Sequence, residues 1–311
     1  MSLYRSPYLA ARAYATDTLI YANHEAFPGN IFWVGAAGSN EADSASSGQS
    51  PDNPFATIDY AIGRCTASQG DVIFVLPGHT ETITTAGGIA QDVAGVSIIG
   101  LGTGANRPTI SFGTADTATW TISGANCVVK NILVKPTVDE LVSMFVISAA
   151  NVLIDGVDYV DNTTVQALQF ILTTADADYL TVRNLRHWKG TACAGTEKWI
   201  SLIGTQNARI LDSTFFMVLR DNAAACVINA DANSRLTEIG RIRAHVTGYT
   251  SGLVSNVIGA SGATGIHYDS RHYNDTTVVT TINDCPSMAS FEVYCSNDLD
   301  KNGILDPVVG S

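Results

Sequence analysis

Residues 126–132, NCVVKNI, and residues 151–157, NVLIDGV, share one pattern, in which an Asn is followed three positions later by an aliphatic residue. Five further segments fit the same frame. The anchors of the whole series are Phe74, Ile98, Val129, Ile154, Val182, Ile210 and Leu236. Successive anchors lie between 24 residues (74 to 98) and 31 residues (98 to 129) apart. The middle of the chain is therefore an internal repeat whose length varies by a few residues.

A repeat of this length predicts a solenoid of stacked coils. Equivalent strands would lie about 4.8 Å apart and bury alternate apolar residues, while the turns absorb insertions. A β-sandwich expects turn signals every ~8–12 residues and gives no reason for the observed repeat. We therefore predict an all-β fold, a right-handed parallel β-helix. An Asn at each bend suits this fold, because Asn tolerates left-handed backbone and stacked Asn side chains can form a ladder.

The segment 53–65 is predicted to form a short helix that caps one open end of the stack, where unpaired strand edges would invite aggregation. Asn53 is a good N-cap residue and Pro54 suits the first helical position. An apolar face follows at helical spacing, made of Phe55, Ile58, Ile62 and Cys65.

This junction also carries a resemblance to a known family. Residues 53–62 (NPFATIDYAI), 70–73 (GDVI) and 77–81 (PGHTE) resemble the opening of pectin-lyase-like right-handed parallel β-helix proteins, with His79 where an aromatic residue is common. The resemblance covers roughly residues 30–260 and implies the fold. It does not imply one activity, because this superfamily includes polysaccharide lyases, hydrolases, bacteriophage tailspikes and non-catalytic virion proteins.

A narrower resemblance points to tailed bacteriophages. Residues 29–34 (GNIFWV), 96–102 (VSIIGLG) and 107–112 (RPTISF) look like segments of phage structural proteins. That resemblance implies a virion component, often trimeric. The domain organisation that we predict is an N-terminal arm over residues 1–28, a parallel β-helix over residues 29–260, and C-terminal strands with an acidic tail over residues 261–311.

The composition excludes several classes of partner. The net charge is −12 and only 17 residues are basic, which argues against nucleic acid because a phosphate backbone requires clustered Lys and Arg. No apolar run approaches the ~18–20 residues that span a bilayer, so we predict no membrane association. The first residues lack a secretory signal, which predicts synthesis in the host cytoplasm. The six cysteines show no zinc spacing and are predicted to be free thiols, with a Cys285–Cys295 pair as the less favoured alternative.

The search for a catalytic constellation favours a protein without enzymatic activity. Asp155 and Asp158 could approach the separation of a glycosidase pair, ~5–9.5 Å, but acidic residues also decorate solvent-facing turns. Exposed arginines would be expected in a lyase, yet none of the candidates sits in a recognisable lyase motif; these are Arg183, Arg186 and Arg241. We therefore predict no catalytic residues and no enzyme.

Two segments could hold a metal ion. The string from His267 to Asp275 contains two His and two Asp residues besides other polar groups, but its spacing matches no closed zinc site. The tail places oxygen side chains at alternate positions around Gly303, as in the first part of a calcium loop; the candidate ligands are Asp298, Asp300, Asn302 and Asp306. Val309 stands where a bidentate Glu is expected, so an acidic tail without Ca²⁺ is the favoured alternative. We predict no other cofactor.

The N-terminal arm is predicted to bind a partner, because aromatic residues and Arg are favoured at interfaces. Its candidate contact residues are Tyr4, Arg5, Tyr8, Arg12, Tyr14 and Tyr21. The alternative is a disordered leader, since chain termini often fray.

The leading functional hypothesis is a non-enzymatic bacteriophage virion protein that decorates and stabilises the capsid surface. It would associate with itself as a homotrimer and with the phage major capsid protein. The alternative is a tail fibre or tailspike that binds or cleaves host polysaccharide.

Overall fold

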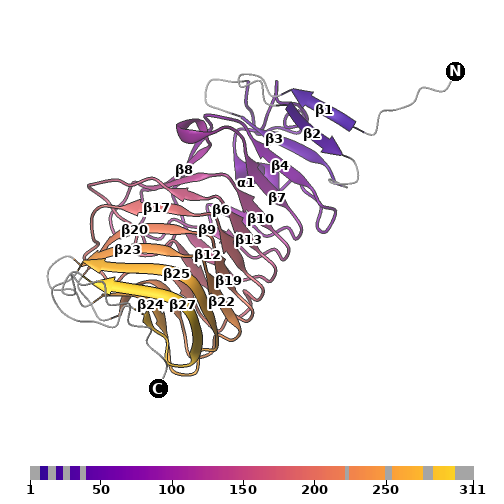
Figure 1. The fold of residues 1–311 in the computed structure, drawn as a ribbon. Coiled ribbons are helices and arrows are strands. Elements are labelled where there is room, and N and C mark those ends of the chain that lie inside the picture. Colours follow the sequence, from indigo (N-terminus) through magenta and orange to yellow (C-terminus); the bar gives the residue numbers. More distant parts are fainter. Residues whose placement is uncertain are drawn as a thin grey trace.

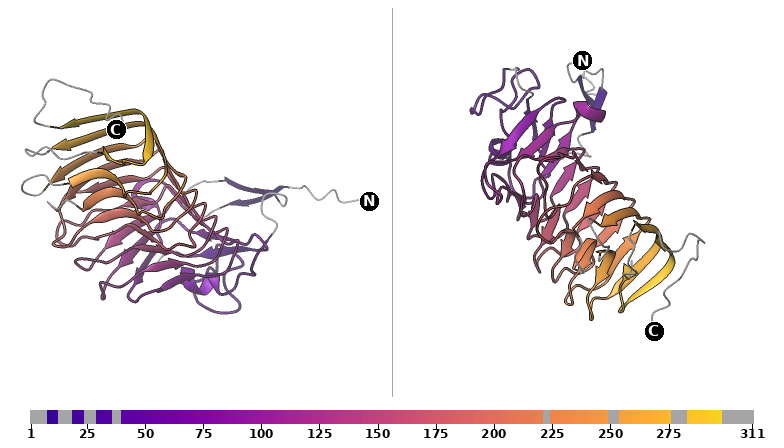
Figure 2. Two further views of the ribbon diagram at one scale, coloured as in Figure 1. Left: turned by 90° about the horizontal axis from the view of Figure 1, so that it is seen from below. Right: turned by 90° about the vertical axis from the view of Figure 1, so that its left-hand side faces the viewer.

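The computed structural model describes residues 8–12, 19–23, 29–35, 40–220, 224–248, 254–275 and 283–297. Short parallel strands wind around one axis and stack into an elongated solenoid (Figures 1 and 2). This architecture confirms the predicted all-β parallel β-helix. None of the helices among these residues has the length and apolar character that crossing a membrane requires.

Three faces make up the solenoid. The first face contains β3 (Ile31–Val34), β4 (Val72–Val75), β7 (Ser97–Gly100), β10 (Val128–Lys130), β13 (Leu153–Asp155), β16 (Thr181–Arg183), β19 (Arg209–Leu211) and β22 (Thr237–Gly240). The second face contains β5 (Thr80–Ile83), β8 (Thr109–Phe112), β11 (Leu133–Pro136), β14 (Asp158–Tyr159), β17 (Arg186–Lys189), β20 (Thr214–Leu219) and β23 (Arg243–Gly248).

The third face contains β6 (Ile89–Gln91), β9 (Trp120–Ile122), β12 (Phe145–Ile147), β15 (Ile171–Thr173), β18 (Lys198–Leu202), β21 (Ala225–Ala230), β24 (Val254–Gly259) and β26 (Asn283–Asp284). Two long strands, β25 (Gly265–Asp275) and β27 (Met288–Asn297), run across both the first and the second face. A 3-10 turn, η1 (Gly104–Asn106), connects β7 to β8. An antiparallel pair, β1 (Tyr8–Arg12) and β2 (Leu19–Asn23), lies in the N-terminal segment.

Strand register confirms the repeat in the middle of the chain and corrects it at both ends. The pairing runs from Ile98 through Val129, Ile154 and Val182 to Ile210, as predicted. At the N-terminal end Ile73 is the partner of Ile98, not Phe74. All four residues of β4 are buried, so alternation alone could not tell its two faces apart.

At the C-terminal end the predicted anchor, Leu236, is wrong. Its place is taken by Ile239, which pairs with Ile210. Leu236 is 65% exposed and has a φ of 54°, so it stands at the bend that Asn207 forms one coil earlier with a φ of 57°. The next residue of the anchor series is His267, which pairs with Ile239.

The bend before each first-face strand from β4 to β22 adopts left-handed backbone. Asn126, Asn151 and Tyr179 all have a φ between 58° and 61°. The backbone N–H of Asn126 donates to the Ala150 carbonyl at 3.0 Å, and that of Asn151 donates to the Asp178 carbonyl at 2.8 Å. The bends are thus joined from coil to coil by backbone hydrogen bonds. An Asn side-chain ladder like the one predicted is not seen among the described hydrogen bonds of these residues.

The capping helix exists but is shorter than predicted. α1 spans Ile58–Ile62, and its N-cap is Thr57, whose side chain accepts from the Tyr60 N–H at 3.3 Å. The predicted N-cap residue, Asn53, precedes an extended segment. Phe55 pairs there with Val34, because its N–H donates to the Trp33 carbonyl and its carbonyl accepts from Gly35. These ladder bonds keep residues 53–55 out of the helix, while the α1 face still buries apolar side chains on the core.

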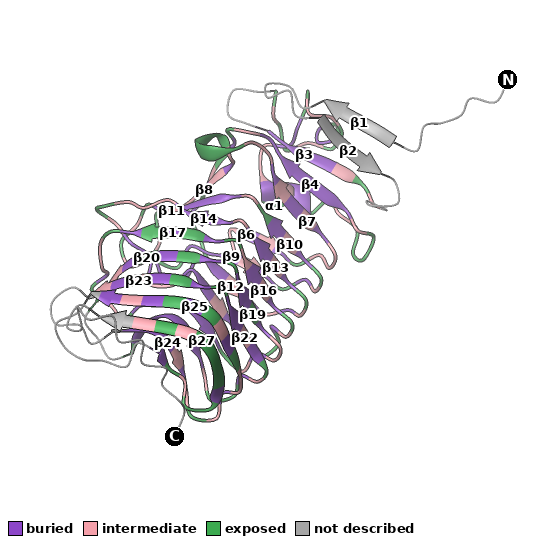
Figure 3. Ribbon diagram, viewed as in Figure 1, coloured by how far each residue is buried: buried purple, intermediate pink, exposed green. Residues whose placement is uncertain are grey.

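The interior of the middle coils is a stack of aromatic rings. The ring centroids of Trp120 and Phe145 are 5.4 Å apart, those of Phe145 and Phe170 are 5.3 Å apart, and those of Phe170 and Trp199 are 6.0 Å apart. All four side chains are fully buried. Figure 3 shows buried residues recurring on strand after strand along the stack. Packing of this kind stabilises by about 0.5–1.5 kcal/mol per pair beyond area burial.

The interior becomes polar in the last coils. His267, His272, Asn256 and Asn274 are at most 2% exposed, although the partners of His267 and Asn274 one coil earlier are the apolar residues Ile239 and Val246. Burying a polar group costs free energy unless it is hydrogen-bonded. The last coils are therefore held together by a hydrogen-bond network rather than by apolar packing alone.

The left-handed bend generates a stability prediction. Asn151→Val should lower the free energy of unfolding by about 1–2 kcal/mol, because a β-branched side chain clashes with the backbone at a φ of 58°. Asn151→Gly should change it by less than about 0.5 kcal/mol, because Gly adopts this φ freely. Denaturant unfolding would measure both variants. An equal loss in both would mean that the Asn side chain itself stabilises the bend.

Candidate functional site

The outer side of the second face carries an ordered set of side chains over its last coils. Register aligns Trp188 of β17 with Phe216 of β20, then with His245 of β23 and Tyr273 of β25. We call these four residues the aromatic column. The residues between the exposed positions, such as His187 and Phe215, point inward and are buried. The column therefore follows from the alternation of side chains along each strand.

The rings of the aromatic column contact one another in sequence. The ring centroids are 6.0 Å apart for Trp188 and Phe216, 4.6 Å for Phe216 and His245, and 4.5 Å for His245 and Tyr273. Each pair is close to edge-to-face. Trp188 is 65% exposed and Phe216 is 38% exposed. Because large apolar side chains are seldom aligned on a water-exposed face, this column marks a contact surface.

A second column runs beside the first, two residues earlier on each strand. It contains Arg186, Thr214, Arg243 and Arg271, and we call it the arginine column. Tyr294 of β27 continues it by pairing with Arg271. The three arginines are exposed. Three cations and an aromatic row therefore share one face of a chain whose net charge is −12.

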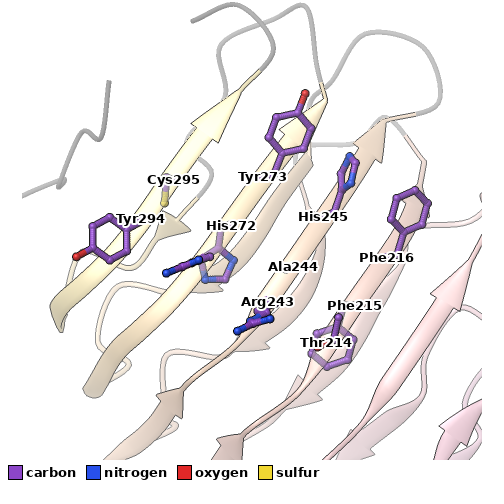
Figure 4. Close-up of a pocket in the computed structure, with 11 residues that line it drawn as sticks. Thr214, Phe215, Phe216, Arg243, Ala244, His245, His272, Tyr273, Tyr294 and Cys295 are labelled. Carbon is purple, nitrogen blue, oxygen red and sulfur yellow. The ribbon is translucent and has the colours of Figure 1, made fainter. Parts of the chain in front are cut away.

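The two columns line a groove of about 620 Å³ that crosses β20, β23, β25 and β27. Figure 4 shows Phe216, His245 and Tyr273 in a row on neighbouring strands, with Thr214 and Arg243 one step back along the same strands. A second hollow of about 460 Å³ adjoins it between Trp188 and Phe216. The walls of the groove and of the adjoining hollow are largely apolar side chains with a few polar groups. Such walls suit recognition of a ligand that has both apolar and charged surfaces.

The acid pair considered in the sequence is structural. Asp158 accepts from the Arg107 guanidinium at 2.6 Å and from the Arg186 backbone N–H at 2.9 Å. Asp155 accepts from the Asn184 side chain at 2.6 Å and from Arg183 at 3.0 Å. Burial alone would raise the pKa of Asp155, but these hydrogen bonds outweigh it and hold the pKa below its usual value. Both carboxylates are therefore committed to arginine partners.

The predicted metal and partner residues are placed as follows. His267 and His272 face each other in the interior, and in the described part of the chain no group of three or more His, Cys, Asp or Glu residues is arranged to hold a metal ion. The candidate calcium ligands lie outside the described residues; these are Asp298, Asp300, Asn302 and Asp306. None of the six cysteines forms a disulfide, so the alternative Cys285–Cys295 pair is not formed.

The arm residues cannot be placed at a contact. Tyr8, Arg12 and Tyr21 lie on β1 and β2, of which the structure describes the backbone, and Tyr4, Arg5 and Tyr14 lie outside the described residues. The binding role of the arm stays a prediction.

Sequence analysis missed the two columns, although a signal was present. Relative to the inward anchor of each coil, the arginine column stands four positions later and the aromatic column six positions later. From Val182 these positions are Arg186 and Trp188, and from His267 they are Arg271 and Tyr273. The signal becomes visible only with the corrected anchors Ile239 and His267, because an anchor at Leu236 shifts the frame by three residues.

Comparison with known proteins gives matches only among solved structures. A rhamnogalacturonan lyase matches at 14% identity and a TM-score of 0.43, covering 88% of this chain and 88% of that chain. The crystal structure of pectate lyase Pel9A matches at 14% identity and a TM-score of 0.49, covering 86% of this chain and 77% of that chain. No protein-family model and no curated protein matches the chain. At this identity the likeness concerns the fold alone.

These matches correct one expectation. The sequence prediction of a protein without enzymatic activity is contradicted, because both solved structures that match most of the chain are lyases. The prediction rested on the absence of a recognisable paired-carboxylate or lyase motif in the sequence. The phage origin and the virion role stay predictions.

The structural role of the acid pair can be tested by stability. Asp158→Ala should lower the free energy of unfolding by about 3 kcal/mol, because it leaves the largely buried Arg107 guanidinium without its carboxylate partner. Asp176→Ala, at an exposed acid, should change it by no more than about 0.5 kcal/mol. Thermal or denaturant unfolding would check both. If Asp158→Ala is as stable as the parent protein, the carboxylate is available for another role.

Proposed function

We propose that this protein binds an extended, negatively charged polysaccharide along the outer side of its second face. The observation that carries the proposal is the pairing of the aromatic column with the arginine column over four successive strands. This corresponds to the alternative hypothesis of the sequence, a protein that binds or cleaves polysaccharide.

The aromatic column fits sugar rings. A pyranose has an apolar face of C–H groups that packs on aromatic rings, and its hydroxyls can bond to polar side chains nearby. Neighbouring strands lie about 4.8 Å apart, which is close to the advance of one sugar in an extended chain. A polysaccharide lying along the solenoid axis would therefore meet one aromatic residue per sugar.

The arginine column favours an acidic polymer. Guanidinium groups bind carboxylates in a bidentate manner and remain charged at every accessible pH. Arg243 and Arg271 are one strand apart, and Arg186 is two strands from Arg243. A single-stranded nucleic acid also combines anionic groups with stacking rings, and the net charge of −12 opposes the approach of either polyanion, so an oligonucleotide is one arm of the binding test.

Binding can be measured by isothermal titration calorimetry with acidic and neutral oligosaccharides. The two matched lyases suggest the first acidic ligands, fragments of pectate and of rhamnogalacturonan. Trp188→Ala and Arg271→Ala should each weaken binding about tenfold, equivalent to about 1.4 kcal/mol. The loss for Arg271→Ala should shrink at high salt, because charge pairing is screened.

Matched controls lie on other parts of the solenoid. Tyr179 is 57% exposed at a first-face bend, and Arg64 is exposed just after α1. Tyr179→Ala and Arg64→Ala should bind as the parent protein does. Equal binding by neutral and acidic oligosaccharides would remove the role of the arginines. If a single-stranded oligonucleotide binds and no oligosaccharide does, the proposal is wrong and nucleic acid is the ligand.

A second candidate function is cleavage of the bound chain by β-elimination, which one observation favours. His245 lies two residues from Arg243 and has its ring 4.5 Å from that of Tyr273. An arginine paired with a uronate carboxylate makes the adjacent C5 proton more acidic, and an imidazole can accept that proton. The C4–O bond then breaks as the C4–C5 double bond forms, and the leaving oxygen takes a proton from the Tyr273 phenol or from water.

The elimination produces an unsaturated uronate whose ultraviolet absorbance can be followed directly. His245→Ala should reduce the rate at least about a hundredfold, in keeping with the loss of a general base, while it weakens binding far less. Tyr179→Ala is again the control. Binding without any unsaturated product, from either acidic polymer, would leave the protein a binding protein and not a lyase.

A further inference from the structure

Two buried histidines lie directly beneath the groove and form one directional chain of hydrogen bonds. His267 and His272 both belong to β25, and their Nε2 atoms are 3.0 Å apart. His267 Nδ1 is 3.1 Å from the Asn283 Oδ1, and His272 Nδ1 is 3.4 Å from the Asn256 Nδ2. The two rings are no more than 2% exposed. The chain therefore links β24, β25 and β26 inside the solenoid.

The partners determine which ring nitrogens carry hydrogen. The Asn283 oxygen can only accept, so His267 Nδ1 donates to it and His267 Nε2 is left as an acceptor. His272 Nε2 then donates to His267 Nε2, and His272 Nδ1 accepts from the Asn256 amide. Both rings are neutral in this arrangement, and every ring nitrogen has a complementary partner.

A proton added to the pair always leaves Nδ1 of His272 protonated. If it binds His267 Nε2, the hydrogen of His272 must move from Nε2 to Nδ1 to avoid two facing N–H groups. If it binds His272 Nδ1 directly, the result at that atom is the same. In either case an N–H group of His272 faces the N–H groups of Asn256, and this contact is repulsive. Asn256 relieves it by turning its amide, because its Oδ1 is buried without a hydrogen-bond partner among the described residues.

Turning that amide acts on the groove. The Asn256 Nδ2 also lies 3.3 Å from the Tyr273 carbonyl and 3.4 Å from the Ala244 carbonyl. These two carbonyls belong to β25 and β23, the strands that carry Tyr273, His245, Arg243 and Arg271. A turned amide would withdraw its donor from both strands and place its oxygen against their carbonyl oxygens.

We propose that the buried pair of His267 and His272, with Asn256, is a pH-sensitive device that weakens polysaccharide binding in the groove when the pair takes up a proton. This inference rests on the proposed function, since it concerns regulation of the same surface. The device is local to the last coils, where β23 and β25 hold half of the aromatic column.

The surroundings of the pair offer little compensation for a positive charge. The residues that pair with or hydrogen-bond to the two histidines from β22, β23, β24, β26 and β27 are Ile239, Ala244, Asn256, Asn283, Ser290 and Cys295. The thiol of Cys285 follows β26, and burial raises its pKa to about 12. The charged groups of the neighbouring strands lie on the outside; they are Glu238, Arg243, Asp269, Arg271, Asp284 and Glu292.

Burial lowers the pKa of His267 to about 4 and, with the nearby His267 as a second cause, lowers the pKa of His272 well below its usual value. The unfolded chain would take up these protons near pH 6.5. The folded arrangement is therefore fully favoured above about pH 6.5 and is progressively disfavoured as the pH falls towards about 4.

The experiment measures the dissociation constant of the acidic oligosaccharide from pH 8 down to about pH 4, for the parent protein and for His272→Gln. The parent should bind with constant affinity above about pH 6 and lose about twofold by pH 4, where the buried pair is about half protonated in the free protein. His272→Gln should lose less affinity over the same range, because the remaining titrating groups are those of the ligand and those that both proteins have in common. His79→Gln, which removes a buried imidazole in the first coils, should keep the parent profile.

The same pH profile in the parent and in His272→Gln would overturn the inference. Because that variant could fold poorly, a histidine NMR titration of the parent protein provides a second readout. The His267 and His272 ring signals should shift over the same pH range as the ring signals of Tyr273. If no oligosaccharide binds at any pH, the proposed function fails. The NMR titration then tests by itself whether protonation of the histidine pair alters the groove. Tyr273 signals that do not change with pH would overturn the inference.

Discussion

The hydrogen bonds between equivalent strands of successive coils are the constraint on which the rest of this protein depends. They pair Val129 with Ile154, and Ile154 with Val182, without a slip of register. Since side chains alternate along a strand, one register aligns the inward residues into a core and the outward residues into columns. The aromatic core stack and the aromatic column of the groove are two consequences of the same backbone pairing.

The middle coils and the last coils of the solenoid have different interiors. In the middle coils the interior is filled by rings such as Phe145 and Trp199, which pack without directional requirements. In the last coils histidine and asparagine side chains replace them, and each needs a partner in a particular orientation. The polar interior lies behind the very strands that carry the groove. The same hydrogen-bonded side chains therefore stabilise the last coils and connect the interior to the strands of the groove.

The fold was predictable because it is encoded many times over. An Asn or a Gly at the bend and an aliphatic residue three positions later recur in coil after coil, so that errors at Phe74 and Leu236 did not change the architecture. The capping helix was predictable in kind but not in extent, because the ladder bonds of Phe55 to β3 compete with helix formation and depend on contacts distant in sequence.

The site was harder to predict, since its residues are far apart in sequence. Trp188 and Tyr273 become members of one surface only when the register of every intervening coil is known. A search for acid pairs led instead to Asp155 and Asp158, whose arginine partners could not be recognised without the structure.

Thr214 interrupts the arginine column between Arg186 and Arg243. The side chains along the surface therefore have a defined, non-uniform order. A ligand that advances one sugar per strand would present its charges to the protein in the order cation, hydroxyl, cation, cation. A polymer shifted by one sugar would meet a different sequence of partners unless all of its sugars are alike. Loss or duplication of a single coil would change that order while leaving the fold intact, so recognition could diverge by whole-coil steps rather than by substitutions within a fixed pocket.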